Sequence, residues 1–296
     1  MDSINMLFHK VTLSRRTAVL AAAFIFMMVG PGAWQMPVAS AAEQGSGAAG
    51  PEKVLVIGAT GRTGRLIVSE LLSRKHEVRG LTRNVQRARE GNSSVEWVQG
   101  DLRKPSTFKN IVNGVDRIVF AAGSSSYLDP TNIPQKVEFE AVAALIDLGV
   151  ATKVKHVTLM SSAGVGHADP QATEGFAGLL RWKSDAESYL RNSGLSYTIV
   201  RPSALTEEPG GRSGIALAQG DAVFANLIHT SRADVAKVIV ETLFNPAAQR
   251  KTFEMYNGVT KDLDDYNVAI GMPAHAKRLK PDAPDAVAAR HPELKR

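Results

Sequence analysis

Three glycines near residue 60 have the spacing of a phosphate-binding turn. Gly58, Gly61 and Gly64 follow four apolar residues, 54–57, that predict a buried parallel strand, and apolar residues at helical spacing follow over 66–72. Glycines between a strand and a helix permit a sharp turn, a close approach of backbone to a pyrophosphate, and tight packing of the helix. The N–H groups that begin the helix would face the phosphates. We therefore expect nucleotide contacts, rather than an ordinary tight turn, at Gly58, Thr60, Gly61, Arg62, Thr63 and Gly64.

The second predicted strand, residues 77–81, ends without the acidic residue that binds the ribose hydroxyls in NAD-preferring folds. The segment Leu81-Thr82-Arg83-Asn84 follows instead. The fork-shaped guanidinium of Arg83 is suited to a 2′-phosphate, and Arg62 could flank the same group. The sequence thus favours NADP as the cofactor, with NAD possible. The alternative is that both arginines are solvated surface charges.

Further strands are predicted over residues 95–99, 116–120, 156–160 and 251–257, and helices over 137–148 and 234–243. This alternation predicts an α/β fold, a Rossmann-like doubly wound parallel sheet wrapped by helices. Ligands of such sheets bind beyond the carboxyl ends of the strands. The turns after the first, second, fourth and fifth strands should therefore meet around one crevice.

Several residues at these strand ends are candidates for cofactor contacts. After the third strand, Asp101 could accept from an adenine amino group and Leu102 could lie against the ring, although an Asp there is also typical of a turn cap. The small-residue turn after the fourth strand could lie against a ribose or the nicotinamide. The remaining candidates are Ala121, Ala122, Gly123 and Ser161.

The first 42 residues have the pattern of an export signal. Ser14-Arg15-Arg16-Thr17 precedes the apolar run Ala18–Val29, and Ala39-Ser40-Ala41 offers small residues for cleavage. The paired arginines indicate the twin-arginine route and a periplasmic location. The alternatives are a plain secretory signal and an uncleaved membrane anchor. Residues 43–52 then form a linker, residues 53–271 the folded domain, and residues 272–296 a flexible charged tail.

Composition excludes some classes of site. The chain of 296 residues has no cysteine, so disulfides and thiolate chemistry are excluded, and no histidine cluster predicts a metal site. Its 35 Lys and Arg against 29 Asp and Glu give a net charge of +6, scattered along the sequence. No basic run interleaved with aromatics indicates nucleic-acid binding. The expected partners are a nicotinamide dinucleotide and a small molecule.

Together these segments resemble the atypical branch of the short-chain dehydrogenase/reductase superfamily, with its NmrA-like and flavin-reductase-like members. The similarity covers roughly residues 53–258. It is carried by GATGRTG (58–64), LTRN (81–84), GDL (100–102), AAG (121–123), SS (161–162), WKSDAESYLRNSGLSYTIVRPSAL (182–205) and SRADVAKVIVETLF (231–244). The resemblance implies an NAD(P)-binding Rossmann domain with a small C-terminal substrate-side portion, in which Pro202 would line the nicotinamide end.

One departure from the family concerns catalysis. Members with the usual apparatus carry a tyrosine four residues before a lysine, so that both lie on one helix face. Lys183 stands at the lysine position, but residue 179 is Leu. The resemblance therefore implies that Lys183 keeps a role at the cofactor while the usual acid is missing. Ser162 matches the family's serine and could polarise a carbonyl, the alternative being a cap of a turn.

These features leave three functions open. The first is an exported, NADPH-dependent oxidoreductase that reduces a quinone, a flavin or a carbonyl compound without the usual tyrosine. The second is a non-catalytic NADP-binding redox sensor or assembly factor, which Leu179 favours. The third is a sugar-nucleotide epimerase or dehydratase. Fold alone does not decide among them, because function resides in the site.

Overall fold

The computed structural model describes residues 50–124, 131–221, 229–257 and 279–282. The predicted export signal lies outside these residues, as does most of the predicted linker and tail. Within the described ranges, no helix has both the length and the apolar character needed to cross a bilayer.

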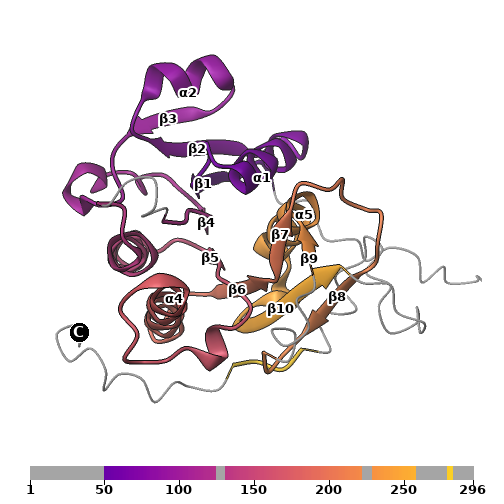
Figure 1. Ribbon diagram of the computed structural model, residues 1–296. Helices are drawn as coiled ribbons and strands as arrows, with labels where there is room; N and C mark the ends of the chain where they lie inside the picture. Colours follow the sequence, from indigo (N-terminus) through magenta and orange to yellow (C-terminus); the bar gives the residue numbers. More distant parts are fainter. Residues whose placement is uncertain (1–49, 125–130, 222–228, 258–278, 283–296) are drawn as a thin grey trace, which may run out of the picture. The chain divides into compact units, whose positions relative to one another are not determined.

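The chain alternates strands and helices through most of its length (Figure 1). The first elements are β1 (Lys53–Ile57), α1 (Arg62–Ser73), β2 (Glu77–Thr82), α2 (Val85–Gly91), β3 (Glu96–Gln99), the 3₁₀-helix η1 (Pro105–Phe108), β4 (Arg117–Phe120), the π-helix η2 (Gln135–Glu140), α3 (Ala141–Thr152) and β5 (His156–Met160). The others are the 3₁₀-helix η3 (Val165–His167), α4 (Gly175–Arg191), β6 (Tyr197–Pro202), β7 (Ala204–Thr206), β8 (Ile215–Ala218), β9 (His229–Ser231), α5 (Arg232–Phe244), the 3₁₀-helix η5 (Pro246–Ala248) and β10 (Lys251–Asn257).

The main sheet has eight strands in the order β3-β2-β1-β4-β5-β6-β10-β8. Every neighbouring pair is parallel except β10 and β8, which are antiparallel. Strands β7 and β9 form a separate parallel pair. The predicted Rossmann-like doubly wound sheet is thus confirmed, and its strand order reverses between β1 and β4, where such folds bind ligands.

Side chains of β1 alternate between two hydrophobic cores, one on each face of the sheet. Val54 and Val56 belong to the core that includes residues of α1 and α5, while Leu55 and Ile57 belong to the core that includes residues of α3 and α4. Figure 1 shows these helix pairs on opposite faces of the sheet. Burial on both faces explains why β1 is an uninterrupted apolar run in the sequence.

The helix predicted over residues 137–148 is two elements in the structure. The π-helix η2 leads directly into α3, and Val137, Glu138 and Phe139 of η2 are all buried. A π-helix changes the direction in which its side chains point, and such distortions are frequent at functional sites. Here it places a carboxylate, that of Glu138, inside the protein.

Both ends of the domain differ from the prediction. Glu52, predicted to lie in the linker, is buried and forms ion pairs with Arg117 and Lys155. Residues 279–282, predicted to lie in a flexible tail, are held on the domain: the N–H of Thr252 and the hydroxyl of Tyr197 donate to Asp282, each at 3.0 Å. A charged, proline-containing composition indicated disorder here, but specific donors on β10 and β6 hold Asp282 on the domain.

A buried histidine in β5 gives a testable pH dependence. His156 is fully buried, and its ring nitrogens lie 2.9 Å and 3.1 Å from the hydroxyls of Ser196 and Thr198. Burial, with a smaller contribution from Arg117, lowers its pKa from 6.5 to about 3. The folded state therefore keeps this group neutral while the unfolded chain gains a proton below pH 6.5. Stability is present above that pH and is lost as the pH falls toward 3.

Because of His156, we expect the free energy of unfolding to be about 1.4 kcal/mol lower at about pH 5.5 than at about pH 7. Urea unfolding at both pH values measures it. His156→Gln should lose that much less stability over the interval than the wild type, whereas His167→Gln, a change at an exposed histidine, should behave as wild type. Equal losses in the wild type and His156→Gln would contradict the assignment.

Candidate functional site

The glycine turn between β1 and α1 is closed by backbone on both sides. Gly58 has φ +87°, and a Cβ added to it would lie 2.7 Å from the nitrogen of Ala122 in the turn after β4. A Cβ on Gly64 would lie 1.9 Å from the carbonyl oxygen of Gly58. No side chain of the described residues caps α1, so the N–H groups of its first turn stay open to a ligand. This geometry suits an anion at the helix N-terminus.

A cavity of about 240 Å³ lies in front of this turn, at the carboxyl ends of β1, β2, β3 and β4. We call it the turn cavity. Most of the residues predicted to contact a cofactor line it together: Gly58, Thr60, Gly61, Arg83, Asp101, Leu102, Ala121, Ala122 and Gly123. Residues more than 60 positions apart in the sequence thus share one wall, as the parallel order of the strands requires.

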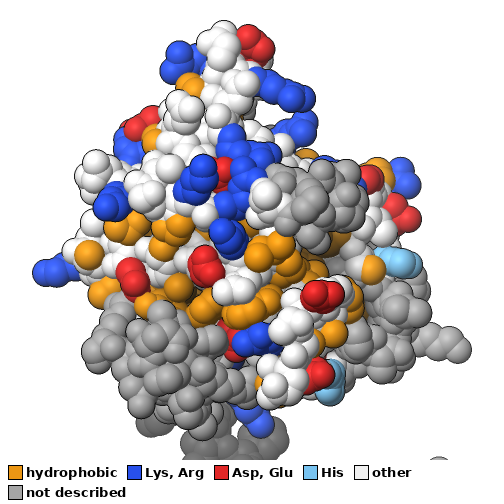
Figure 2. Space-filling view, turned by 60° about the vertical axis from the view of Figure 1, so that its left-hand side comes forward, with side chains coloured by type: hydrophobic (Ala, Val, Ile, Leu, Met, Phe, Trp, Pro, Cys, Tyr) orange, Lys and Arg blue, Asp and Glu red, His pale blue; other side chains and the backbone are white. Residues whose placement is uncertain are grey.

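A second cavity of about 590 Å³ adjoins the first and shares Thr60, Thr82 and Arg83 with it. We call it the arginine cavity, because Arg65 and Arg87 line it as well. In the described part of the chain, none of its three arginines forms an ion pair with a carboxylate. Figure 2 shows basic side chains gathered above a band of hydrophobic surface.

The sequence analysis missed Arg65 and Arg87, although helical spacing carries a signal for both. Arg65 lies one turn of α1 after its first residue. Asn84 caps α2, accepting from the N–H of Arg87 at 3.0 Å, and so begins the helix that presents Arg87 to the cavity. Asn84, the cap directly after β2, therefore fixes where Arg87 lies.

The side chains of Arg62 and Thr63 make contacts that the sequence did not predict. The guanidinium of Arg62 is 2.9 Å from Glu207, and Arg232 of α5 is 2.8 Å from the same carboxylate. Arg232 also donates to the hydroxyl of Thr63 at 3.1 Å. The ion pair with Arg232, more than that with Arg62, holds the pKa of Glu207 below its usual value. These contacts join α1 to Glu207 and to α5. Neither Arg62 nor Thr63 lines the two cavities.

Asp101 forms the turn cap that was the alternative to adenine binding. Both of its carboxylate oxygens accept from the guanidinium of Arg103, and its Oδ1 also accepts from the N–H of Arg103 at 3.0 Å. Hydrogen bonds from Arg103 lower the pKa of Asp101, so it stays a carboxylate. Arg103 itself lines the turn cavity, which adds another cation to that wall.

Lys183 is held by a buried carboxylate. Its ammonium is 2.8 Å from Oε2 of Glu138, whose side chain is 2% exposed. Oε1 of Glu138 accepts from the N–H of Ser124 at 2.7 Å and from its hydroxyl at 3.0 Å. Ser124 directly follows the turn Ala121-Ala122-Gly123, so Glu138 links Lys183 to the wall of the turn cavity. Leu179 lies one turn earlier on α4.

Ser161, Ser162 and Pro202 lie outside the two cavities. Ser161 is buried beside Lys183 and Glu138. Ser162 is partly buried, and its hydroxyl donates to the carbonyl of Ala163 at 3.0 Å. Pro202 is the last residue of β6, and its carbonyl accepts from the N–H of Ala163 at 2.9 Å.

Comparisons with known proteins identify the family. The model of the NAD(P)H-binding family matches residues 58–246, which include the glycine turn and both cavities. The chain belongs to the NAD(P)H-binding family. The resemblance to atypical short-chain dehydrogenases/reductases is therefore confirmed, and nicotinamide dinucleotide binding is supported.

Individual relatives agree with this membership. An uncharacterised chloroplastic protein of Arabidopsis thaliana, At2g37660, is 30% identical over 69% of this chain and 69% of its own length. Sanguinarine reductase of Eschscholzia californica is 27% identical over 68% of this chain and 88% of its own length. Among solved structures, a putative NAD-dependent epimerase/dehydratase of Bacillus halodurans has a TM-score of 0.61 at 29% identity, covering 71% of this chain and 95% of its own.

The residues of this NAD(P)H-binding protein fit a dinucleotide. Gly58 and Gly64 let the backbone of β1, α1 and the turn after β4 pack closely, α1 begins with open N–H groups, and guanidinium groups line both cavities. Over the described ranges, no group of three or more His, Asp or Glu residues could hold a metal ion. The arrangement therefore suits a phosphate-rich organic ligand.

The buried pair of Glu138 and Lys183 makes a stability prediction. Lys183→Met leaves a buried carboxylate without its cation, and we expect a loss of about 3–5 kcal/mol in unfolding free energy. The double variant Glu138→Gln/Lys183→Met removes both charges and should recover most of that loss. Urea unfolding followed by tryptophan fluorescence measures both variants.

Lys136→Met is the matched control, because Lys136 is exposed on the same π-helix. It should unfold as the wild type does. A Lys183→Met variant as stable as the wild type, or a double variant no more stable than the single one, would refute the structural role of the pair.

Proposed function

We propose that this protein is an NADPH-dependent reductase of a small organic acceptor, namely a quinone, a flavin or a carbonyl compound. One observation carries the proposal: the arginine cavity joins the turn cavity at Arg83, with no acidic residue at the end of β2. A relative that bears the name of a reductase, sanguinarine reductase, supports the class of reaction.

The preference for NADP over NAD follows from charge. A 2′-phosphate is a doubly charged group, and burying it requires several charged donors. Arg65, Arg83 and Arg87 line one cavity beside the position that the adenosine ribose occupies in such folds. An acid at the end of β2 would favour the ribose hydroxyls of NAD, and Thr82-Arg83-Asn84 stands there instead.

The choice of acceptor follows from the missing acid. Bound NADPH would supply a hydride at the nicotinamide end. The usual tyrosine is replaced by Leu179, and Lys183 is engaged by Glu138. Quinones and flavins suit this site, because their reduced anions can take a proton from water. A carbonyl acceptor would instead need its oxygen polarised, and Ser162 is the hydroxyl at the end of β5 with that role.

A non-catalytic NADP-binding sensor or assembly factor is the second candidate. It is favoured by the same two observations, Leu179 and the engaged Lys183. The two candidates share the cofactor site and differ in turnover.

We also propose that the protein works after export by the twin-arginine route. The support is Arg15-Arg16 before the apolar run Ala18–Val29 and a small-residue cleavage site. Export of a folded chain suits a protein that takes up its nucleotide in the cytoplasm.

Cofactor preference can be tested at Arg87. Arg87→Ala should weaken NADPH binding about tenfold, because a charge-assisted hydrogen bond to the 2′-phosphate is lost. Binding of NADH should stay unchanged. Fluorescence titration of residues 43–296 with both nucleotides measures this, with Arg83→Ala as a second variant.

Arg89→Ala is the matched control, because Arg89 lies on the same helix but not in the cavity. It should bind NADPH as the wild type does. Equal losses for NADPH and NADH in Arg87→Ala would contradict a 2′-phosphate site.

The reductase itself can be tested with a panel of acceptors. We expect the wild type to oxidise NADPH in the presence of at least one quinone, flavin or carbonyl compound, followed by the loss of absorbance of NADPH. Ser162→Ala should slow carbonyl acceptors more than quinones. Tight NADPH binding without turnover on any acceptor would reject the reductase and favour the non-catalytic candidate.

A further inference from the structure

The segment after β5, residues 161–168, has little regular structure of its own. We call it the β5 loop. It contains Ser162, and it begins at the sheet edge where the cofactor is expected. Gly164 has φ +93°, and residues 165–167 form only a single 3₁₀ turn. Backbone N–H groups in such a loop need acceptors from elsewhere in the fold.

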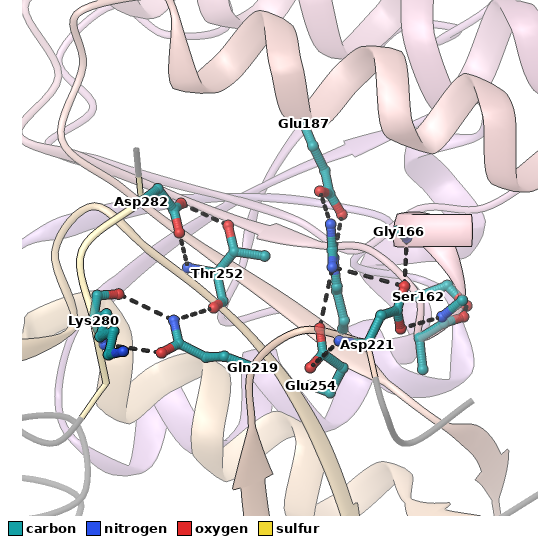
Figure 3. Close-up of polar contacts among 12 residues, drawn as sticks. Ser162, Gly166, Glu187, Gln219, Asp221, Thr252, Glu254, Lys280 and Asp282 are labelled. Atoms are coloured by element: carbon teal, nitrogen blue, oxygen red, sulfur yellow. Dashed lines mark hydrogen bonds and ion pairs between the residues drawn. The ribbon is translucent and has the colours of Figure 1, made fainter. Parts of the chain in front are cut away.

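Asp221 supplies those acceptors from the C-terminal portion. Its side chain is 3% exposed, Oδ1 accepts from the N–H of Gly164 at 2.6 Å, and Oδ2 accepts from the N–H of Gly166. Figure 3 shows Asp221 facing the loop that carries Ser162 and Gly166. One carboxylate thus binds two N–H groups of a loop more than 50 positions earlier in the chain.

The backbone around this contact is adapted to it. Asp221 has φ +61°, a conformation that costs energy for a residue with a side chain and persists only where its surroundings enforce it. A Cβ on Gly166 would lie 2.8 Å from Oδ2 of Asp221, so glycine at that position permits the approach. Both partners are therefore specialised for a close contact.

Buried charges hold Asp221 in place. Its own N–H donates to Glu254 of β10 at 3.0 Å. Arg201 of β6 lies 3.1 Å from Glu254, 3.8 Å from Asp221 and 2.6 Å from Glu187 of α4. Arg191 also pairs with Glu187, at 3.0 Å. A buried carboxylate needs such compensation to remain charged, and a charged acceptor makes stronger hydrogen bonds than a neutral one.

We propose that Asp221 is a positioning residue that fixes the β5 loop, and through it Ser162, at the nicotinamide end of the site. Its effect passes through the loop backbone, because its carboxylate binds Gly164 and Gly166 and not Ser162. The backbone on either side of Ser162 is bonded to β6, through the N–H groups of Ser161 and Ala163, and Asp221 adds two further anchors at Gly164 and Gly166. This inference rests on the proposed reductase function.

The test compares Asp221→Asn with Asp282→Asn. Asp282 is a matched control, since it also accepts a backbone N–H, that of Thr252, but lies away from the β5 loop (Figure 3). In Asp221→Asn the amide exchange of at least one of Gly164 and Gly166 should quicken about tenfold or more, because the amide keeps one oxygen acceptor where the carboxylate has two. Asp282→Asn should leave both amides unchanged.

Kinetics separates positioning from general destabilisation. For a carbonyl acceptor, kcat of Asp221→Asn should fall about tenfold to a hundredfold while NADPH affinity stays unchanged. The double variant Ser162→Ala/Asp221→Asn should be no slower than Ser162→Ala, because both changes remove the same hydroxyl from its place. Additive losses, or an unchanged kcat, would overturn the proposal.

A second variant perturbs the contact without changing any charge. Gly166→Ala should displace the carboxylate from the loop and reproduce the faster exchange at Gly164. If the wild type reduces no acceptor, the reductase function fails, and amide exchange alone decides whether Asp221 holds the loop. Unchanged exchange in both variants would overturn that role whatever the activity.

Discussion

At the corner between β1 and α1, backbone meets backbone with no room for a side chain. The carbonyl of Gly58 occupies the place that a Cβ of Gly64 would take, at 1.9 Å, and the other side of Gly58 rests against Ala122. This contact fixes the direction of α1 relative to β1 and β4, the strands between which the sheet order reverses. The open N–H groups at the start of α1 therefore face the space in front of the glycine turn, where the turn cavity and the arginine cavity meet.

Two buried carboxylates organise the loops at the same edge of the sheet. Glu138 accepts from the backbone after β4 and pairs with Lys183, and Asp221 accepts from the backbone after β5 and lies near Arg201. Glu138 lies 14 positions after Ser124, and Asp221 lies 57 positions after Gly164. Buried ion pairs contribute little net stability, because desolvation offsets their attraction. Their effect here is to specify one arrangement of the backbone at Ser124, Gly164 and Gly166.

The strand-end residues that meet at the glycine turn were largely predictable, and the contacts of Lys183 were not. Parallel strands bring their carboxyl ends together, so Gly58, Arg83 and Ala121 could be assigned to one crevice before any coordinates were known. The pairing of Arg62 with Glu207 was not predictable, because Glu207 lies 145 positions later in the chain. The partner of Lys183 was missed because Glu138 turns inward only through a π-helix, which has no clear signal in the sequence.

The sequence by itself determined the parallel strands of the sheet, the glycine corner and the absence of the usual tyrosine. Apolar runs, glycine spacing and residue identity are local properties of the sequence. An apolar run predicts a buried strand, and the glycine spacing predicts the sharp turn before α1. The tertiary structure alone decided which charges meet. Strand β8, of four residues, is too short for a period to be recognised, and its pairing with β10 leads the chain to Asp221, which contacts the loop of Ser162. Ion pairing depends on distance in space, and residues 57 positions apart in the chain carry no local sign that they will touch.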